Sequence, residues 1–140
     1  MTERAGDRWL PIWIGPAEAA ALALTMESAE TPRPFTYQLA AHMVAAAGSG
    51  ITEVRITKLA AAIFYATVVV SAPDGPKEVD ARPSDAVNLA LVSSAPIKID
   101  ASVFGMARQP PHDEDLPADA ATTADIAAEA QQAMREWFAK

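Results

Sequence analysis

Alternation between apolar and polar residues divides the chain into short strands and helices. Residues 52–59 alternate with the period of a half-buried strand, whereas residues 63–72 are apolar and β-branched on both faces, which is typical of a central strand. Other stretches follow the helical period, and several begin with proline or end at glycine. The predicted elements, in chain order, are strand 9–14, helix 15–29, helix 35–48, strand 52–59, strand 63–72, strand 77–82, helix 83–94, strand 96–100 and helix 125–140.

One phrase occurs twice in this pattern. Residues 14–24 read IGPAEAAALAL and residues 81–91 read ARPSDAVNLAL. Both have proline, then an acid two positions later, and both end in Leu-Ala-Leu. Each copy begins a predicted helix directly after a predicted strand, so we interpret the phrase as a duplicated strand-helix unit. The predicted fold class is α+β, with a mixed or antiparallel sheet, packed helices and an additional C-terminal helix.

The chain length of 140 residues indicates one domain with an appendage. We assign residues 1–108 to the α+β domain, residues 109–124 to an acidic linker rich in Pro and Ala, and residues 125–140 to an amphipathic helix. The helix is expected to dock on the domain or on a neighbouring subunit. Its apolar stripe consists of Ile126, Ala130, Met134, Trp137 and Phe138.

Composition narrows the classes of function. The net charge is −7, and because residues 113–140 hold seven acids and two bases, residues 1–112 are close to neutral. The body therefore lacks the basic patch of a typical nucleic-acid binder. The absence of cysteine excludes thiolate metal sites and disulfides, and suits a reducing cytosol. The apolar run at 59–72 is too short to span a membrane as a helix, and no signal segment begins the chain, so we expect a cytoplasmic protein without membrane contact.

Glu18 and Asp85 are the matched acids of the repeat. With Gly15 and Arg82 as N-caps, both acids fall at the third helical position. There a carboxylate can reach the N-cap amide and interacts favourably with the helix dipole, which contributes about 0.5–1 kcal/mol. This capping role needs no catalytic function.

The second copy of the repeat carries additional charges. Glu78, Asp80 and Arg82 alternate along a strand, and Ser84 and Asp85 follow at the helix start. Asp80 and Asp85 could share one divalent cation at this corner, with Arg82 left to bind a phosphate. The alternative is an exposed strand face with an ordinary Asp-Arg pair.

Two further residues could complete such a site. Glu18 could join the metal ligands Asp80 and Asp85 if the two copies of the repeat face each other. Arg33 lies between two prolines in an extended segment and could reach a phosphate, although it could equally bond backbone carbonyls. The candidate catalytic residues are then Asp80, Arg82 and Asp85, and the candidate substrate-binding residues are Arg33, Arg82 and Ser84.

The blocks LPIWIGPAEAAALAL, TPRPFTYQL, DARPSDAVNLAL and APIKI, in this order, resemble the bifunctional nuclease domain family over residues 9–107. The Asp-Ala-Arg-Pro-Ser-Asp-Ala block is the most specific part. The resemblance implies an α+β domain that is often oligomeric. It also implies an activity ascribed to some plant relatives, the cleavage of RNA and DNA assisted by a divalent metal such as Mg²⁺ or Mn²⁺.

One departure from this resemblance affects the expected activity. Family members commonly read Arg-Pro-x-Thr-His-Asp-Leu at the start of the second helix, whereas this chain has Tyr37 and Gln38 in place of the His-Asp pair. Tyr and Gln retain hydrogen bonding but do not provide a base at neutral pH. The sequence therefore leaves two functions open. One is a metal-dependent nuclease for RNA or DNA, and the other is a non-enzymatic oligomeric module that binds a protein or an anionic ligand.

Overall fold

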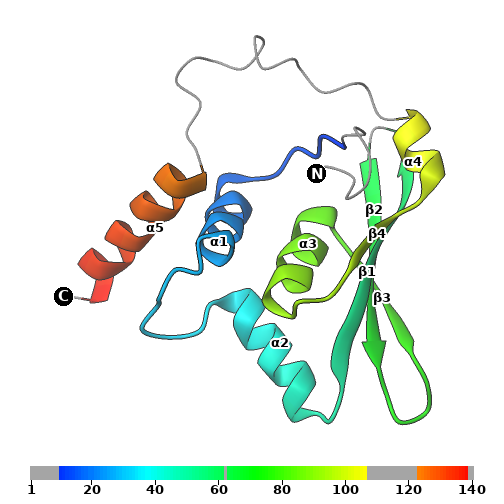
Figure 1. The fold of residues 1–140 in the computed structure, drawn as a ribbon, viewed down its shortest axis with the longest axis horizontal. Coiled ribbons are helices and arrows are strands. Elements are labelled where there is room, and N and C mark those ends of the chain that lie inside the picture. Colours follow the sequence, from blue (N-terminus) through cyan, green and yellow to red (C-terminus); the bar gives the residue numbers. More distant parts are fainter. Residues whose placement is uncertain (1–9, 62, 107–122, 139–140) are drawn as a thin grey trace.

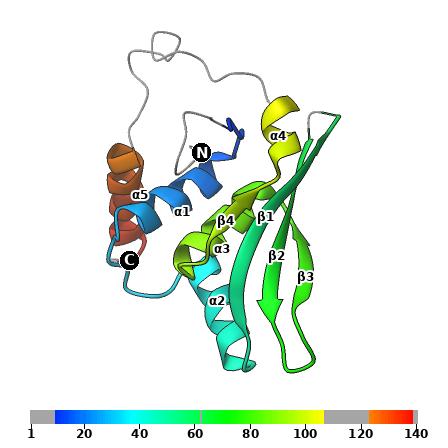
Figure 2. The ribbon, with the colours of Figure 1, turned by 45° about the vertical axis from the view of Figure 1, so that its right-hand side comes forward.

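A computed structural model describes residues 10–61, 63–106 and 123–138. Helices pack against one face of a four-stranded sheet of strand order β3-β2-β1-β4, and in both views α3 lies nearest the sheet, with α1 and then α5 beyond it (Figure 1, Figure 2). The elements are α1 (Pro16–Met26), α2 (Thr36–Ala46), β1 (Gly50–Ala60), β2 (Ile63–Ser71), β3 (Lys77–Ala81), α3 (Pro83–Val92), β4 (Ile97–Ile99), α4 (Ala101–Met106) and α5 (Thr123–Phe138). This arrangement confirms the α+β prediction.

The sheet is mixed. β1 pairs antiparallel with β2, β2 pairs antiparallel with β3, and β4 runs parallel to β1. β2 is an interior strand, as its apolar sequence predicts. The inner face of the sheet and the apolar side of α3 form the main core. Its fully or almost fully buried members are Leu10, Val54, Ile56, Ala66, Val68, Ala86, Ala90 and Val103.

The helix boundaries follow local signals in the sequence. α1 and α3 each begin at a proline, behind the extended N-caps Gly15 and Arg82. After α2, Gly48 has φ +74°, and its amide donates to the Ala45 carbonyl at 2.9 Å. A glycine adopts this left-handed conformation without a steric penalty, which is why the predicted C-terminal glycine ends the helix.

The predicted strand 9–14 is wrong in its described part. Residues 10–14 form no strand, although Leu10 is fully buried in the core and Ile12 packs against it. Pro11 has no amide hydrogen to donate to a ladder, so the segment contributes apolar side chains to the core without joining the sheet. Trp13 is 95% exposed. The repeat therefore corresponds to two matched helix starts, and only the second follows a strand.

The C-terminal helix docks on the domain, as one of the sequence-based alternatives predicts. Ala127 is buried against Ala23 and Leu24 of α1, and Ile126 and Ala130 flank this contact. The side chains of Met134, Trp137 and Phe138 lie outside the described residues, as does the predicted linker 109–124 except for its last two residues, which belong to α5. The short helix α4 was not predicted. Among the described helices, none combines the length and hydropathy needed to cross a membrane.

Candidate functional site

The starts of α1, α2 and α3 meet at the side chain of Arg82. Its Nε donates to Asp85 Oδ2 at 2.7 Å, and its Nη2 donates to Asp85 Oδ1 at 2.9 Å and to Glu18 Oε1 at 3.0 Å. The hydroxyl of Tyr37 donates to Asp85 Oδ1 at 2.8 Å. We call Glu18, Tyr37, Arg82 and Asp85 the Arg82 cluster. It joins both acids of the repeat through one guanidinium.

Packing between α1 and α3 brings the two acids to this point. Ala and other small residues on the facing sides of these helices allow a close approach. Asn88 is fully buried between them, and its Nδ2 donates to the Ser84 carbonyl at 3.0 Å and to the Glu18 carbonyl at 3.4 Å. Because one of these bonds crosses from α3 to α1, Asn88 fixes the register in which Glu18 faces Arg82.

Gly15 makes room for the Glu18 carboxylate. The carboxylate lies so close to Gly15 that a Cβ at this position would collide with Oε2. Gly15 itself has φ −73°, a backbone conformation open to any residue, so the requirement for glycine comes from this close approach. In the described part of the chain, Oε1 of Glu18 binds Arg82 whereas Oε2 has no hydrogen-bond partner.

The charges of the cluster compensate one another. The Arg82 guanidinium, followed in importance by the Tyr37 hydroxyl, holds the pKa of Asp85 below its usual value, although partial burial opposes this shift. Asp85 and Glu18 in turn raise the pKa of Arg82. Two carboxylates and one guanidinium sum to one negative charge. The N-termini of α1 and α3, whose first turns carry the two acids, each contribute roughly half a positive charge, so the cluster is close to neutral.

Tyr37 is a hydrogen-bond donor at neutral pH. Burial and, after it, the hydrogen bond to Asp85 together raise its pKa to about 12. A phenol with this pKa stays protonated near pH 7, so it cannot serve as a general base there. In the cluster, its hydroxyl donates to Asp85 Oδ1, the oxygen that also accepts from Arg82 Nη2.

An open cleft of about 610 Å³ extends from the cluster between α1, α2 and α3. The cluster forms its polar end, and one residue of α5, Ala130, contributes to its edge. Most of the remaining lining is small or apolar. These residues are Ala17, Ala20, Ala21, Leu24, Phe35, Thr36, Ala40 and Leu89.

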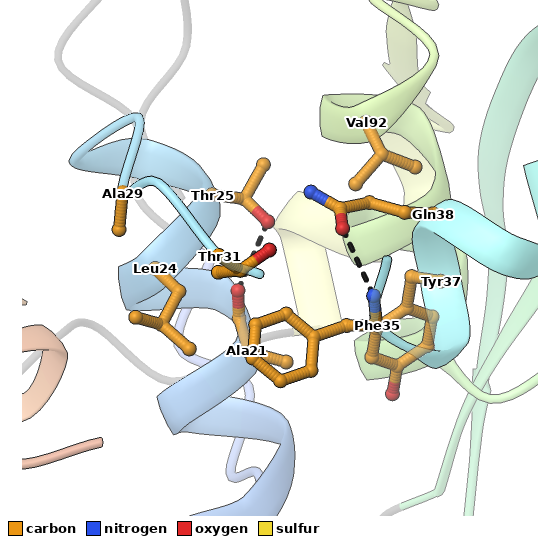
Figure 3. A pocket seen from close by; sticks show the side chains of 9 residues that line it. All are labelled: Ala21, Leu24, Thr25, Ala29, Thr31, Phe35, Tyr37, Gln38 and Val92. Carbon is orange, nitrogen blue, oxygen red and sulfur yellow. Dashed lines mark hydrogen bonds between the residues drawn. The ribbon is translucent and has the colours of Figure 1, made fainter. Parts of the chain in front are cut away.

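A smaller cavity of about 10 Å³ adjoins the cleft, and both share Phe35 and Tyr37 in their lining. Figure 3 shows the Phe35 ring turned toward Ala21 and Leu24 of α1, while the Tyr37 hydroxyl points away from Gln38. The Gln38 side chain accepts a hydrogen bond from the Phe35 amide at 2.9 Å. Gln38 therefore caps the N-terminus of α2 and orients Phe35, and it is not a member of the Arg82 cluster.

Comparison with known proteins identifies the family. The bifunctional nuclease domain matches residues 1–112. The chain belongs to the bifunctional nuclease domain family. An uncharacterized protein of Mycobacterium tuberculosis is 44% identical over 107 residues, which cover 76% of this chain and 63% of the relative. Bifunctional nuclease 1 of Arabidopsis thaliana is 31% identical over 93 residues, which cover 64% of this chain and 29% of the relative.

A rice protein extends this comparison. Bifunctional nuclease 1 of Oryza sativa subsp. japonica is 27% identical over 100 residues, which cover 69% of this chain and 30% of the relative. The chain thus spans less than two thirds of the length of each of these relatives. The residues that the family model matches include the Arg82 cluster, since all four residues of the cluster lie within 1–112.

The structure brings together some of the residues that the sequence singles out and separates others. Glu18, Arg82 and Asp85 meet. Asp80 pairs with Thr67 in the β-ladder, whereas its neighbour Ala81 pairs with the buried Ala66. Successive strand residues point to opposite faces, so Asp80 points to the outer face of the sheet, away from α3. The register gives no support to a cation shared by Asp80 and Asp85.

The remaining candidates lie at the margin of the cluster. Ser84 is half-buried in the first turn of α3 and uses its carbonyl to bind Asn88. Arg33 is exposed, its carbonyl accepts from the Thr31 hydroxyl at 2.9 Å, and it does not line the cleft. In the described part of the chain, neither side chain forms a hydrogen bond with Arg82.

The donor set does not fit a resident divalent cation. Within residues 10–61, 63–106 and 123–138, no group of three or more His, Asp or Glu side chains is positioned to hold a metal. The two carboxylates that do meet are bound to the Arg82 guanidinium, which occupies the position between them. Mg²⁺ and Mn²⁺ bind through several oxygen ligands, so a cation here would have to displace Arg82.

Sequence reasoning missed Tyr37, Asn88 and Phe35 as parts of this site. In the sequence, Tyr37 is distinctive only as a departure from the family pattern. Its hydrogen bond to Asp85 joins residues 48 positions apart, so no local spacing indicates it. Asn88 has a visible signal, because it is a polar residue within the otherwise apolar inner side of a predicted helix.

Proposed function

We propose that this domain is a nuclease that cleaves phosphodiester bonds of RNA or DNA at the Arg82 cluster. The observation that supports this most directly is an exposed arginine held rigidly by two carboxylates at the polar end of an open cleft. Two plant relatives whose names describe them as bifunctional nucleases align with this chain over 93 and 100 residues. Phosphoryl transfer depends mainly on positioning and on electrostatic stabilisation, which a fixed guanidinium provides.

Each residue of the cluster then has a distinct role. Arg82 would bind the scissile phosphate and stabilise the negative charge that develops in the transition state. Asp85 and Tyr37 would hold Arg82 in place, and Asp85 would remain ionised because its pKa is lowered. The free Oε2 of Glu18 would accept the proton from the attacking water while the bond between phosphorus and the leaving oxygen breaks. The leaving oxygen would take its proton from solvent, to which the cleft is open.

Cleavage of fluorescent single-stranded RNA and DNA tests this proposal. We expect Glu18→Gln to lose most of the activity, since it removes the proton acceptor and keeps the size of the side chain. Glu78→Gln is the matched control, because Glu78 pairs with Arg55 on the outer face of the sheet. Loss of activity in both variants, or in neither, would contradict the assignment of the site.

The role of a metal requires a separate comparison. Reactions with Mg²⁺, with Mn²⁺ and with EDTA, each run with the parent and with Asp80→Asn, test the metal requirement that the family resemblance implies. Activity that survives EDTA would exclude a metal requirement. Activity that needs a metal and Asp80 would instead support the sequence-based pairing of Asp80 and Asp85, and would contradict the roles proposed above.

A binding module without catalysis is the second candidate, and one observation favours it. Tyr37 stays protonated at neutral pH, so the cluster lacks the imidazole base that many relatives could use at this position. Absence of cleavage under every metal condition, with a folded protein, would favour this candidate. Homo-oligomer formation and a cytoplasmic location stay predictions, which sedimentation and fractionation would test.

A further inference from the structure

The cleft beside the Arg82 cluster has the lining of a ligand site. On α1, Ala17, Ala20, Ala21 and Leu24 follow one another at helical spacing and form a continuous apolar wall. Because three of these four residues are alanine, the wall leaves space in front of it. Phe35 provides an aromatic face on the α2 side.

We propose that this cleft receives one unpaired nucleotide of a single-stranded nucleic acid, with its base against Phe35 and the alanine wall and its phosphate on Arg82. The choice of nucleic acid as the ligand rests on the proposed nuclease function. The base-binding role of the cleft goes beyond that function.

The dimensions of the cleft fit this ligand. A volume of about 610 Å³ lies within the range of roughly 300–1,000 Å³ that is usual for small-molecule sites, which are mostly apolar with a few placed polar groups. A base within a duplex is stacked and paired, so it cannot enter such a cleft unless it leaves the helix. An unpaired base presents its flat face freely and can stack on an aromatic ring.

Arg82 provides the polar contact at the end of the cleft. Its Nε and Nη2 groups are used by Asp85 and Glu18, whereas Nη1 makes no hydrogen bond in the described part of the chain. Two N–H donors therefore stay available on a side chain that is 67% exposed. Since the cluster is nearly neutral overall, it does not repel a phosphate strongly.

The described strands offer little attraction to a phosphate backbone. Arg55, Lys77 and Lys98 are each paired with a carboxylate, and Lys58 lies over the Tyr65 ring on the outer face of the sheet. Residues 1–112 hold 11 acids and nine bases. Binding must then come mainly from burial of the base, with about one phosphate neutralised. For a single strand this predicts a shallow salt dependence, with a slope of log K against log salt near −0.7.

Fluorescence anisotropy with two probes tests the proposal. One probe is a short single-stranded DNA of mixed sequence, and the other is an abasic strand with the same number of phosphates. Both are measured in EDTA with the full chain. We expect the base-bearing strand to bind roughly 5- to 160-fold more tightly, as one stacked base predicts.

Matched tryptophan substitutions locate the binding site. Ala40→Trp and Ala17→Trp fill the cleft from opposite walls and should abolish the preference for the base-bearing strand. Ala45→Trp is the control, because Ala45 is an exposed alanine of the same helix as Ala40 and does not line the cleft. Circular dichroism confirms the fold of each variant, and two cleft variants keep the test valid if one of them does not fold.

Three results would overturn the proposal: equal binding of both probes, no binding of either, or a base preference that survives in the folded cleft variants. Its failure is distinguishable from that of the nuclease assignment. Base-selective binding without any cleavage would remove only the catalytic assignment. Cleavage by a protein that does not distinguish the two probes would remove only the base-binding role of the cleft.

Discussion

The hydrogen bond from Tyr37 to Asp85 predicts a measurable coupling that needs no substrate. Tyr37→Phe removes only the hydroxyl that lies 2.8 Å from Asp85 Oδ1. A hydrogen bond to a charged group contributes about 1.5–3 kcal/mol, but solvent contact reduces this value. The Asp85 side chain is 27% exposed and keeps both bonds from Arg82, so we expect Tyr37→Phe to lower the free energy of unfolding by about 1 kcal/mol.

Urea denaturation of four proteins measures the energy of the hydrogen bond between Tyr37 and Asp85. The parent, Tyr37→Phe, Asp85→Ala and the double variant form a cycle whose coupling energy should be about 1 kcal/mol, within the range found for residues in direct contact. Once Asp85 is alanine, removing the Tyr37 hydroxyl should cost little, because the acceptor is gone.

Tyr65→Phe is the control for the same chemical change. Tyr65 is 42% exposed on the outer face of the sheet, beneath Lys58, and its free energy of unfolding should change by less than about 0.5 kcal/mol. A coupling energy of zero, or equal losses for Tyr37→Phe and Tyr65→Phe, would refute the cluster as described.

Three further predictions concern the surroundings of the cluster. Gly15→Ala should displace the Glu18 carboxylate and reduce the cleavage rate. The free energy of unfolding in urea should change by less than about 1 kcal/mol, because the backbone conformation of Gly15 suits alanine. An unchanged cleavage rate would contradict the close approach of the Glu18 carboxylate to Gly15. Ala127→Asp should release α5 and make it sensitive to proteolysis, since it places an unpaired charge in a buried contact, whereas Ala128→Asp on the exposed side should not. The raised pKa of Tyr37 means that its contribution to stability is complete below pH 10 and is lost as the pH rises through about 12. Ultraviolet difference absorbance between the parent and Tyr37→Phe should show ionisation of Tyr37 with a midpoint near pH 12. A midpoint near pH 10 in the folded protein would contradict the burial of Tyr37.

Local signals predicted the helix starts well. Pro16 and Pro83 each stand one residue after an extended N-cap, and the acid two positions later is where a helix start accommodates negative charge. These features depend on a few adjacent residues, so a single sequence contains them. The interior position of β2 likewise follows from its apolar character on both faces.

Long-range geometry limited the prediction of the site. The alternation from Asp80 to Arg82 suggested a shared strand face, but the strand ends at Ala81, and Arg82 has already left the pleat as the N-cap of α3. Asp80 therefore faces outward while Arg82 turns toward α1. The absence of a strand at residues 10–14 has a related cause, because an apolar pattern indicates burial and does not specify a hydrogen-bonded partner.

The most direct test of the account is the cleavage rate of Arg82→Gln, measured beside Arg82→Lys and the parent with single-stranded RNA and DNA. Arg82 forms the centre of the cluster, and lysine cannot reproduce its contacts to two carboxylates. If the cluster is the active site, folded Arg82→Gln should cleave at least roughly 100-fold more slowly, the usual loss for one transition-state donor, and Arg82→Lys should recover only part of the rate. Cleavage by folded Arg82→Gln at the parental rate would contradict the assignment of nuclease activity to this cluster.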